Sequence, residues 1–507
     1  MSVPVVIVGA GPTGVVAATL LARHGVESIV LERWPRVYPQ PRAVHLDDEI
    51  YRVLARVGVA EEFAAISRPS EGLRLVDRRH RVLAQFDRAG GAPTSGYPRA
   101  NMFDQPDLEL LLRHNLKRFP AATLRGDVEV TGLRPLSPGR VEVSLTDRST
   151  DRPETIEARY VLGCDGANSV VRPAIGSSYD DLGFEQRWLV VDVESQVDLG
   201  QWEGVHQVCD TDRAGTYMRI GATRHRWEFR LRDDESATTF DTLATLRPLI
   251  EPWAGHVGDG DLDLVRVADY TFRAEVADRW RRGNVFLLGD AAHLTPPFIG
   301  QGMGAGIRDA VNLAWKLAGT IDGSLPASVL DSYESERRPH ATSLVGLART
   351  TGMLMTAGGV TGDIARRTLL PALSRLPRVR AHLLDSETPA LEDAVWARRS
   401  SRDRLAGRLA PSPEVEGRTL DARLGDRWAV ISRRAPSPSD EEELTRRGIE
   451  LVSVADEHPL GAWLIGGRAV AALVRPDRTV LLSADDASTV CATAASLEIV
   501  ASHILRE

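Results

Sequence analysis

The spacing of apolar and polar positions at the start of the chain predicts a strand, a helix and a second strand. Residues 3–8 form a continuous apolar run, residues 13–23 have helical spacing, and residues 28–32 form another apolar run. Short continuous apolar runs indicate strands buried on both faces, as in parallel sheets. This β-α-β unit predicts an α/β protein that opens with a doubly wound sheet.

The next patterns extend this first domain. Helices are expected over residues 47–66 and 105–118, followed by an antiparallel hairpin over 124–150 and a buried strand at 160–163. The hairpin segment alternates apolar and polar residues, which is typical of strands with one solvent-facing side.

The stretch from 186 to 274 is rich in strand patterns and predicts a mainly antiparallel β-sheet inserted into the first domain. Residues 284–288 then return to a buried strand, and a long helix is expected over about 304–320. Residues 326–355 and 362–385 also have helical spacing.

The end of the chain predicts a separate small α/β domain. Residues 399–418 are rich in Arg, Pro and Ser and suggest a linker, and a helix at 438–447 and a hairpin at 469–484 follow. The expected division is a discontinuous first domain over 1–180 and 275–345, a substrate-binding sheet domain over 181–274 with part of 71–98, a helical connector over 346–404, and a C-terminal domain over 405–507.

Composition places the protein among ordinary globular chains. Its 507 residues are 43% hydrophobic and 26% charged, with a net charge of −8 that gives no sign of nucleic-acid binding. Residues 3–22 are apolar but contain glycines and lack a preceding basic segment, so neither a signal peptide nor a membrane span is expected. The three cysteines form no C-x-x-C pair, and a cytoplasmic protein is expected.

Three glycines between the first strand and the first helix have the G-x-G-x-x-G spacing of a dinucleotide-binding turn. Gly9 permits the tight turn, Gly11 lets a pyrophosphate approach the backbone, and Gly14 allows close packing of helix and strand. The helix that starts near Pro12 and Thr13 then presents its amides and positive dipole end to the phosphates.

Glu32 closes the second strand, 18 residues after Gly14. A carboxylate there can accept hydrogen bonds from a ribose diol, which favours FAD or NAD over NADP as the bound nucleotide. The motif does not choose between FAD and NAD.

Residues 283–319 favour a flavin. Asp290 is expected at the carboxyl end of a buried strand, where its carboxylate can bind ribitol or ribose hydroxyls. A turn at Pro297 and a glycine run that includes Gly302 then enter a helix, whose first amides would face an anionic reduced flavin. A third motif, D-G-x-x-S-x-x-R, begins at Asp165: the aspartate can order the turn, and Arg172 can face phosphates or a nicotinamide nucleotide.

In this order, the three motifs resemble those of the flavin-dependent aromatic hydroxylases, single-component monooxygenases related to para-hydroxybenzoate hydroxylase. The resemblance covers roughly residues 3–345. The segments QPRAVHLDDE, TPPFIGQGMGAGIRDAVNLAWKLAG and DSYESERRPHA are similar to the 3-(3-hydroxyphenyl)propionate hydroxylase branch. That branch, and its relatives that act on polyketide phenols, imply a Rossmann-like FAD-binding domain and a thioredoxin-like C-terminal domain.

The resemblance also implies roles for single residues. Glu32 and Arg33 would hold the adenosine, Arg42 would contact the flavin diphosphate or ribose, Gln105 would lie near the ribitol, and Asp290 would be the flavin aspartate. The Pro297 carbonyl would lie beside the reactive flavin carbon, and the amides of Met303 and Gly304 near the isoalloxazine. Gly304 stands where some relatives have asparagine, so only its backbone donor is kept.

The implied activity is hydroxylation of a phenolic or polyketide ring by FAD, NADH or NADPH, and O2 through a flavin C4a-hydroperoxide. The sequence leaves open Baeyer–Villiger oxidation or epoxidation of a polyketide, and a non-catalytic FAD- or NAD-binding module. It also leaves open a homodimer.

Side chains of the predicted inserted sheet are candidate substrate contacts. Tyr217 is a candidate catalytic residue, although a sheet residue is the simpler interpretation, and Trp227 and Phe229 alternate with charged neighbours in the manner of core residues. No His or Cys spacing supports a metal site. Cys491 is alone in the C-terminal domain, so dithiol exchange is not expected there.

Overall fold

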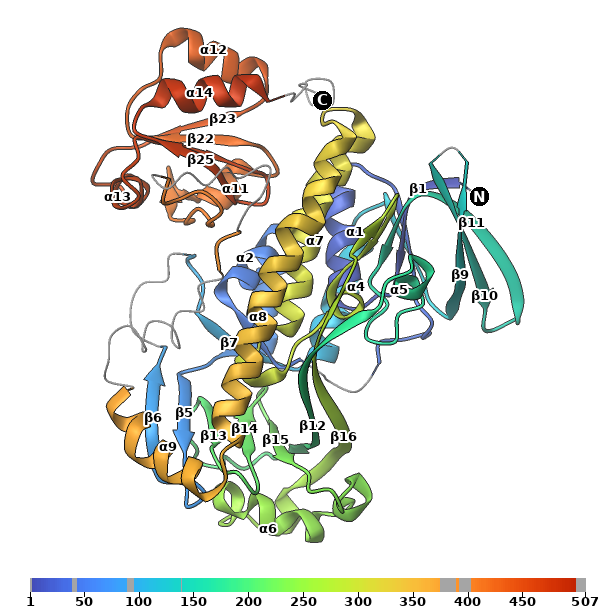
Figure 1. Ribbon diagram of the computed structural model, residues 1–507, viewed down its shortest axis with the longest axis vertical. Coiled ribbons are helices and arrows are strands. Elements are labelled where there is room, and N and C mark those ends of the chain that lie inside the picture. Colours follow the sequence, from blue (N-terminus) through green and yellow to red (C-terminus); the bar gives the residue numbers. More distant parts are fainter. Residues whose placement is uncertain are drawn as a thin grey trace.

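The computed structural model describes residues 2–38, 43–88, 95–137, 139–373, 389–391 and 403–497. It contains two eight-stranded sheets and, toward the C-terminus, a four-stranded sheet. Helices α7 (Gly302–Asp322) and α8 (Ser332–Thr356) run along the molecule between the second large sheet and the C-terminal unit (Figure 1).

The first sheet is built around parallel strands in the order β17-β18-β11-β1-β2-β8, with the β9–β10 hairpin attached to β11. Its strands are β1 (Ser2–Val8), β2 (Ser28–Leu31), β8 (Ala122–Arg125), β9 (Val128–Leu136), β10 (Arg140–Asp147), β11 (Arg152–Gly163), β17 (Arg281–Arg282) and β18 (Val285–Leu287). The predicted β-α-β unit, the antiparallel hairpin and the returning parallel strand are confirmed.

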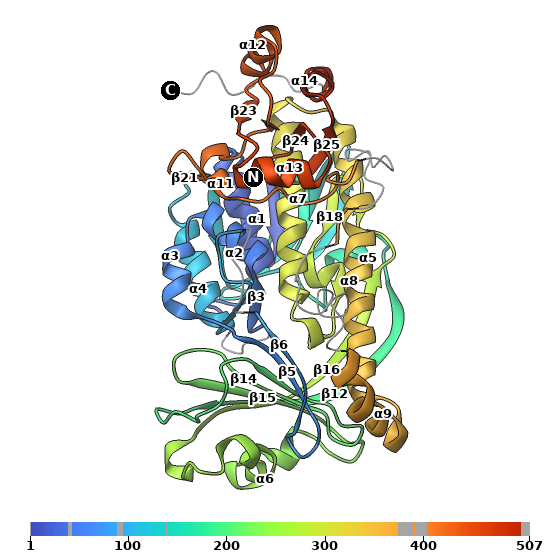
Figure 2. The ribbon, with the colours of Figure 1, turned by 90° about the vertical axis from the view of Figure 1, so that its left-hand side faces the viewer.

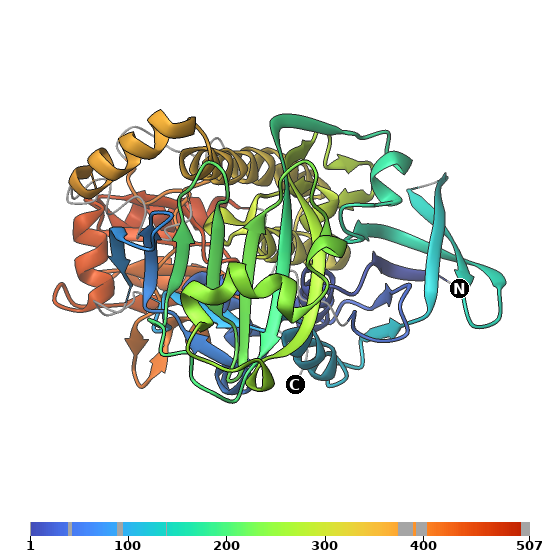
Figure 3. The ribbon, with the colours of Figure 1, turned by 90° about the horizontal axis from the view of Figure 1, so that it is seen from below.

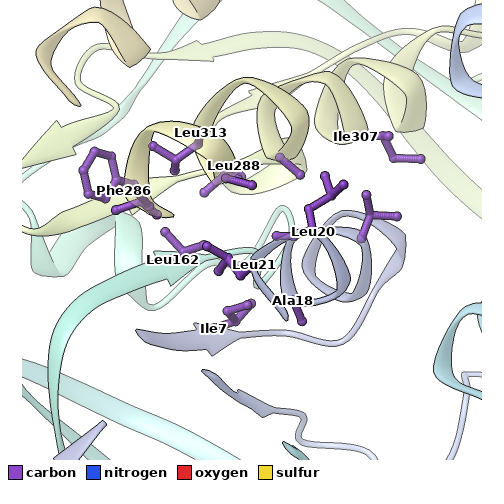
Figure 4. Packing of buried hydrophobic residues seen from close by; sticks show 14 of the residues in the cluster. Ile7, Ala18, Leu20, Leu21, Leu162, Phe286, Leu288, Ile307 and Leu313 are labelled. Carbon is purple, nitrogen blue, oxygen red and sulfur yellow. The ribbon is translucent and has the colours of Figure 1, made fainter. Parts of the chain in front are cut away.

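Helices α1 (Pro12–Arg23) and α7 pack together over this sheet. Their contact is apolar and buried: Leu20 and Leu21 of α1 lie near Ile307 and Leu313 of α7, above Leu162 of β11 (Figure 4). Burial of such side chains stabilises the fold by about 1.5–3 kcal/mol each. This packing fixes the N-terminal ends of both helices relative to the strand ends.

The predicted helix over 47–66 is two helices, α2 (Asp48–Val57) and α3 (Ala60–Ile66). Gly58 ends α2 with a left-handed φ of 86°, a conformation that glycine adopts without strain. Helix α4 (Gln105–Leu116) is confirmed, and α5 (Val171–Ala174) is a single turn. The small sheet of β3 (His45–Asp47), β7 (Ala100–Phe103) and β4 (Ser67–Pro69) was not predicted, because its strands are too short to show a period.

The second sheet has the order β19-β16-β12-β15-β14-β13-β5-β6. Its strands are β5 (Gly72–Val76), β6 (Val82–Asp87), β12 (Tyr179–Glu194), β13 (Val205–Val208), β14 (Gly215–Arg219), β15 (Arg224–Arg230), β16 (Asp263–Ala277) and β19 (His293–Leu294). Helix α6 (Leu243–Ala254) crosses the outer face of this sheet (Figure 3). The short turn η1 (Ala237–Phe240) contacts α6, and η2 (Asp259–Asp261) follows it in the chain. The inner face lies against the first domain (Figure 2).

Beyond the turn η5 (Ala327–Asp331) and α8, helix α9 (Gly359–Leu373) lies beside β6. The prediction of helix over 362–385 is confirmed up to Leu373, and the remainder lies outside the described residues. Among the residues described, none of the helices combines the length and the apolar character that crossing a membrane requires.

The C-terminal unit is a four-stranded sheet in the order β23-β22-β24-β25 with helices around it. Its elements are β20 (Glu414–Val415), β21 (Arg418–Thr419), α11 (Leu420–Leu424), β22 (Ala429–Ser432), α12 (Pro438–Arg446), β23 (Glu450–Ser453), α13 (Pro459–Gly466), β24 (Ala471–Val474), β25 (Val480–Ala484) and α14 (Ala487–Ser496). The predicted linker is wrong for its described part, because Leu405 and Ala410 are buried in the core of this unit.

Candidate active site

A cavity of about 430 Å³ lies between the first domain and the inner face of the second sheet. Most of the predicted site residues line it. These are Gly9, Gly11, Pro12, Thr13, Glu32, Arg33, Gln105, Asp165, Asp290, Pro297, Gly302 and Met303. Residues from five separate stretches of chain therefore meet around one cavity.

The β1–α1 turn has the geometry that its three glycines predicted. Gly9 has a φ of 100°, and a Cβ atom there would lie 2.3 Å from the carbonyl oxygen of Cys164. A Cβ on Gly14 would lie 2.1 Å from the Gly9 oxygen, so Gly14 serves helix–strand packing and does not line the cavity. Gly11 has open space where its side chain would be, on the cavity side of the turn.

Glu32 lies at the end of β2 and is 8% exposed. Its carboxylate accepts hydrogen bonds from the backbone N–H groups of Ala10 at 2.8 Å and Trp34 at 3.0 Å. These bonds fix the carboxylate at the rim of the cavity beside the turn. A fixed acceptor at this point suits the two hydroxyl groups of a ribose.

Arg113 of α4 also lines this end of the cavity, and sequence reasoning missed it. Its guanidinium donates to the Ala10 carbonyl at 3.0 Å and lies 3.6 Å from Glu109. The side chain of Gln105 accepts from the Ala43 amide at 2.6 Å and donates to Glu109 at 2.7 Å. Arg113 lies on a half-buried face of α4. The hydrophobic spacing of this helix alone therefore did not indicate that its side chain would reach the cavity.

Asp290 is carried by the short turn η3 (Gly289–Ala291) at the end of β18. The hydroxyl of Tyr179 donates to the backbone carbonyl of Asp290, which ties the turn to the second sheet. The turn η4 (Pro297–Ile299) follows, and Gly300 leaves it with a φ of 64° before α7 begins. Both Asp290 and Pro297 line the cavity.

The first turn of α7 points its N-terminal end at the cavity, where Gly302 and Met303 are part of the lining. Amides in a first helical turn have no acceptor within the helix, and the helix dipole adds positive potential. Gly304 does not line the cavity: a Cβ there would lie 2.8 Å from the Arg308 guanidinium and 3.2 Å from Ile50. The asparagine of some relatives would therefore not fit without movement of Arg308.

The turn after β11 is ordered by Asp165, as predicted. Its carboxylate accepts from the Ser169 hydroxyl at 2.6 Å and from the Val170 amide at 2.7 Å. Arg172 does not line the cavity. It donates to the Ala291 carbonyl at 3.1 Å and stacks on Tyr179, so it supports the η3 turn from behind.

Tyr217 does not lie in the cavity. Its neighbours on β14, Thr216 and Met218, line the cavity, whereas Tyr217 points to the opposite face, where its hydroxyl lies 3.0 Å from His225 Nδ1 and its ring packs near Trp253. Alternate residues of a strand face opposite sides, so this placement argues against a catalytic role. Arg42 lies outside the described residues.

Residues 2–348 match the FAD binding domain family. The chain belongs to this family. The match covers more than half of the chain, and the geometry agrees with it, because the open Gly11 turn, the fixed Glu32 carboxylate and the α7 amides suit the ribose, diphosphate and ring system of FAD.

Several named proteins are similar to this chain over almost its full length. A probable NADH-specific resorcinol 4-hydroxylase from Rhodococcus jostii (strain RHA1) is 33% identical over 98% of this chain and 94% of its own. A 3-(3-hydroxy-phenyl)propionate/3-hydroxycinnamic acid hydroxylase from Burkholderia cenocepacia (strain HI2424) is 33% identical over 97% and 95%. The solved structure of the OxyS anhydrotetracycline hydroxylase from Streptomyces rimosus has a TM-score of 0.75 at 27% identity, covering 96% of each chain.

His45 is a further site residue whose role the sequence did not indicate, although it lies in the QPRAVHLDDE segment. Its Nδ1 lies 3.3 Å from the Gly300 carbonyl, and Arg88 lies 3.4 Å from its Nε2. Because arginine only donates, Nε2 is the acceptor and Nδ1–H donates to Gly300. Burial and the nearby Arg88 charge lower the pKa of His45 to about 4, so a neutral imidazole holds the loop before α7.

The described residues contain no group of three or more His, Cys, Asp or Glu side chains that could hold a metal ion. Asp47 instead pairs with Arg308 at 2.5 Å and accepts from Gln301 at 2.9 Å. The acidic segment that starts at Asp47 therefore fixes the start of α7.

Proposed function

We propose that this protein is an FAD-dependent monooxygenase that uses NADH or NADPH and O2 to hydroxylate a phenolic ring. One observation carries this proposal: a single cavity joins a dinucleotide turn and the N-terminus of α7 to a sheet face that carries both apolar and polar side chains. The apolar side chains that can hold an aromatic ring are Leu73, Val190, Met218 and Phe272 of the sheet and Phe298 of η4.

In this proposal, different residues along the cavity bind different parts of FAD. Glu32 and Arg33 would hold the adenosine, the amides after Gly11 the diphosphate, and Asp290 the ribitol chain. The α7 amides at Gly302 and Met303 would stabilise negative charge on the flavin ring. When bound, the flavin supplies hydride acceptance from the nicotinamide and activation of O2, and the chain supplies binding, orientation and exclusion of water.

The names of the relatives favour hydroxylation of a small phenol over Baeyer–Villiger oxidation or epoxidation. Resorcinol and 3-hydroxyphenylpropionate each carry a ring hydroxyl, and the first of these relatives is named as NADH-specific. NADH is therefore the preferred reductant in our proposal. The fold neighbour that acts on anhydrotetracycline extends the substrate class to fused phenolic rings.

The domain division is part of the proposal. Residues 1–180 and 275–345 form the FAD-binding domain, 181–274 with part of 71–98 the substrate-binding domain, 346–404 the helical connector, and 405–507 a thioredoxin-like domain. Two features support a structural role for the last of these. Cys491 has no second cysteine beside it among the residues described. The unit is also attached to α8 by the buried Arg475–Glu336 ion pair and to α7 by a hydrogen bond from Trp315 to Asp477.

The purified protein tests this function. We expect it to be yellow, to release FAD on denaturation, and to consume NADH faster when a hydroxylated arene such as resorcinol is added. Mass spectrometry should find a product with one added oxygen atom that comes from O2. A protein that fails to bind added FAD would refute the proposal, and a lactone or epoxide product would redirect it to the alternative oxidations.

A further inference from the structure

One carboxylate on the sheet side of the cavity has no assigned role. Glu228 lies in the middle of β15 and lines the cavity, and the residue is 7% exposed. Its cross-strand neighbours are Thr216 on β14 and Val190 on β12, which line the cavity too. Glu228 therefore faces the space in which we propose that the aromatic ring binds.

The neighbouring polar groups are already hydrogen-bonded to one another. Arg226 binds Asp192 with two hydrogen bonds of 2.7 and 2.9 Å, and both side chains are 1% exposed. The Thr216 hydroxyl donates to Gln207 at 2.9 Å. Among the residues that the structure describes, none donates a hydrogen bond to the Glu228 carboxylate, and the residue is 7% exposed.

A carboxylate that is mostly withdrawn from water and has no protein donor is unfavourable, because nothing in the protein replaces the hydration that it has lost. The same group becomes favourable when a ligand brings a hydroxyl donor to it. A carboxylate or ether oxygen in that place would instead face a second acceptor. The cavity therefore selects for a hydroxyl group at this position.

The charges around Glu228 favour proton acceptance as well as hydrogen bonding. Burial and the Asp192 charge raise its pKa, while the guanidinium groups of Arg226 and Arg266 oppose this rise, and the net direction is upward. A carboxylate with a raised pKa is a stronger base. These groups come from β12, β15 and β16, and the facing residues of β14, Thr216 and Met218, carry no charge.

We propose that Glu228 accepts the hydrogen bond of the substrate's phenolic hydroxyl and takes its proton as the ring is activated. The phenolic O–H bond breaks, the proton bonds to a Glu228 carboxylate oxygen, and the electron pair stays on the substrate oxygen as a phenolate. An electron-rich phenolate ring is the form that an electrophilic oxygen attacks. This inference rests on the proposed function and assigns the hydroxyl-recognising residue within it.

The test compares the FAD-loaded full chain with Glu228→Gln and a matched control, Glu185→Gln. Glu185 lies on β12 of the same sheet, but its side chain is 63% exposed and pairs with Arg273 at the surface. Binding of resorcinol and of its dimethyl ether is followed by the change in the flavin absorbance spectrum. We expect Glu228→Gln to weaken resorcinol binding about tenfold or more. Binding of the ether should not weaken, because the glutamine amide can donate to the ether oxygen.

The pH profile provides a second measurement. In the wild type, kcat/KM for resorcinol should fall toward acid pH as Glu228 becomes protonated, and in Glu228→Gln this acid limb should disappear while kcat falls. Equal FAD content and circular dichroism show that the variant is folded. Hydroxylation with the same resorcinol affinity and pH profile in both proteins overturns the role of Glu228 and leaves the proposed function intact. A wild type that binds the ether as tightly as resorcinol overturns it as well.

Discussion

The carboxylate of Asp309 in α7 accepts the backbone N–H of Gly289 at 3.0 Å, one residue before Asp290. The same oxygen lies 3.0 Å from His293 Nε2, and the other accepts from Arg337 at 2.8 Å. Asp309 has no exposed surface. Because this one group holds the turn that brings Asp290 to the cavity, it links helix packing to the position of the cofactor site.

We expect Asp309→Asn to lower the free energy of unfolding by about 3–5 kcal/mol, because it leaves the buried Arg337 charge without its partner. FAD affinity should fall as well, since the Gly289 turn loses a charged acceptor. Urea unfolding and FAD titration measure the two effects. The control is Asp259→Asn, whose side chain is 63% exposed, and which should change stability by less than about 0.5 kcal/mol. Equal stability of the two variants would contradict the role of Asp309.

The glycine turn gives a prediction that separates folding from cofactor binding. Gly11→Ala places its methyl group in open space on the cavity side, so we expect a stable protein with much weaker FAD binding. Gly14→Ala places a methyl group 2.1 Å from the Gly9 oxygen and should destabilise the fold by about 1–3 kcal/mol. Thermal unfolding of the FAD-free proteins distinguishes them. An unstable Gly11→Ala protein would show that this glycine serves packing.

Tyr217→Phe tests the placement of Tyr217 behind the sheet. The substitution removes one hydrogen bond to His225 and should cost about 1 kcal/mol of stability, with kcat and KM for the phenol unchanged. Steady-state kinetics decide the matter. A large loss of kcat in a stable Tyr217→Phe protein would return this residue to the list of catalytic candidates.

The sequence predicted those parts of the site that depend on local backbone chemistry. The Gly9 turn, the Glu32 acceptor and the strand that precedes Asp290 are each defined within a few residues, so spacing reveals them. Arg113 and Glu228 reach the cavity only because separate elements pack together, and no local period marks them. For Tyr217, the alternating pattern identifies the strand but does not indicate which face of the sheet lies against the first domain.

Acid pH should weaken the attachment of the C-terminal unit. Burial would raise the pKa of Glu336, but the charges of Arg475 and Lys316 outweigh it and hold this pKa well below its ordinary value of 4.5. Arg52 does the same for Asp421, against burial. The unfolded chain then binds more protons than the folded one, so stability falls as the pH drops below about 4.5. Urea unfolding at pH 7 and pH 4 should show this loss, with a smaller loss in Glu336→Gln.

Buried ion pairs also attach the C-terminal unit to the helices of the first domain. Arg475, before the turn that joins β24 to β25, binds Glu336 of α8 through two hydrogen bonds of 2.9 Å, and Lys316 of α7 donates to the same carboxylate at 2.8 Å. None of these three side chains is exposed to solvent. Removing one partner of a buried pair costs more than the pair contributes, because the other charge stays buried.

We therefore expect Arg475→Met to lower the free energy of unfolding by about 3–5 kcal/mol and to expose the C-terminal unit to limited proteolysis. Arg434→Met is the control, because its side chain is 64% exposed and lies 3.7 Å from Asp456 at the surface. Deleting 403–507 should be more damaging still, since it leaves Glu336 and Lys316 at a bare surface of α7 and α8. NADH oxidation by the full-length Arg475→Met protein at low temperature, where it is folded, should remain, because the cavity residues belong to the other two units. Loss of NADH oxidation in a folded Arg475→Met protein would instead show that the C-terminal unit acts on the flavin site through α7 and α8.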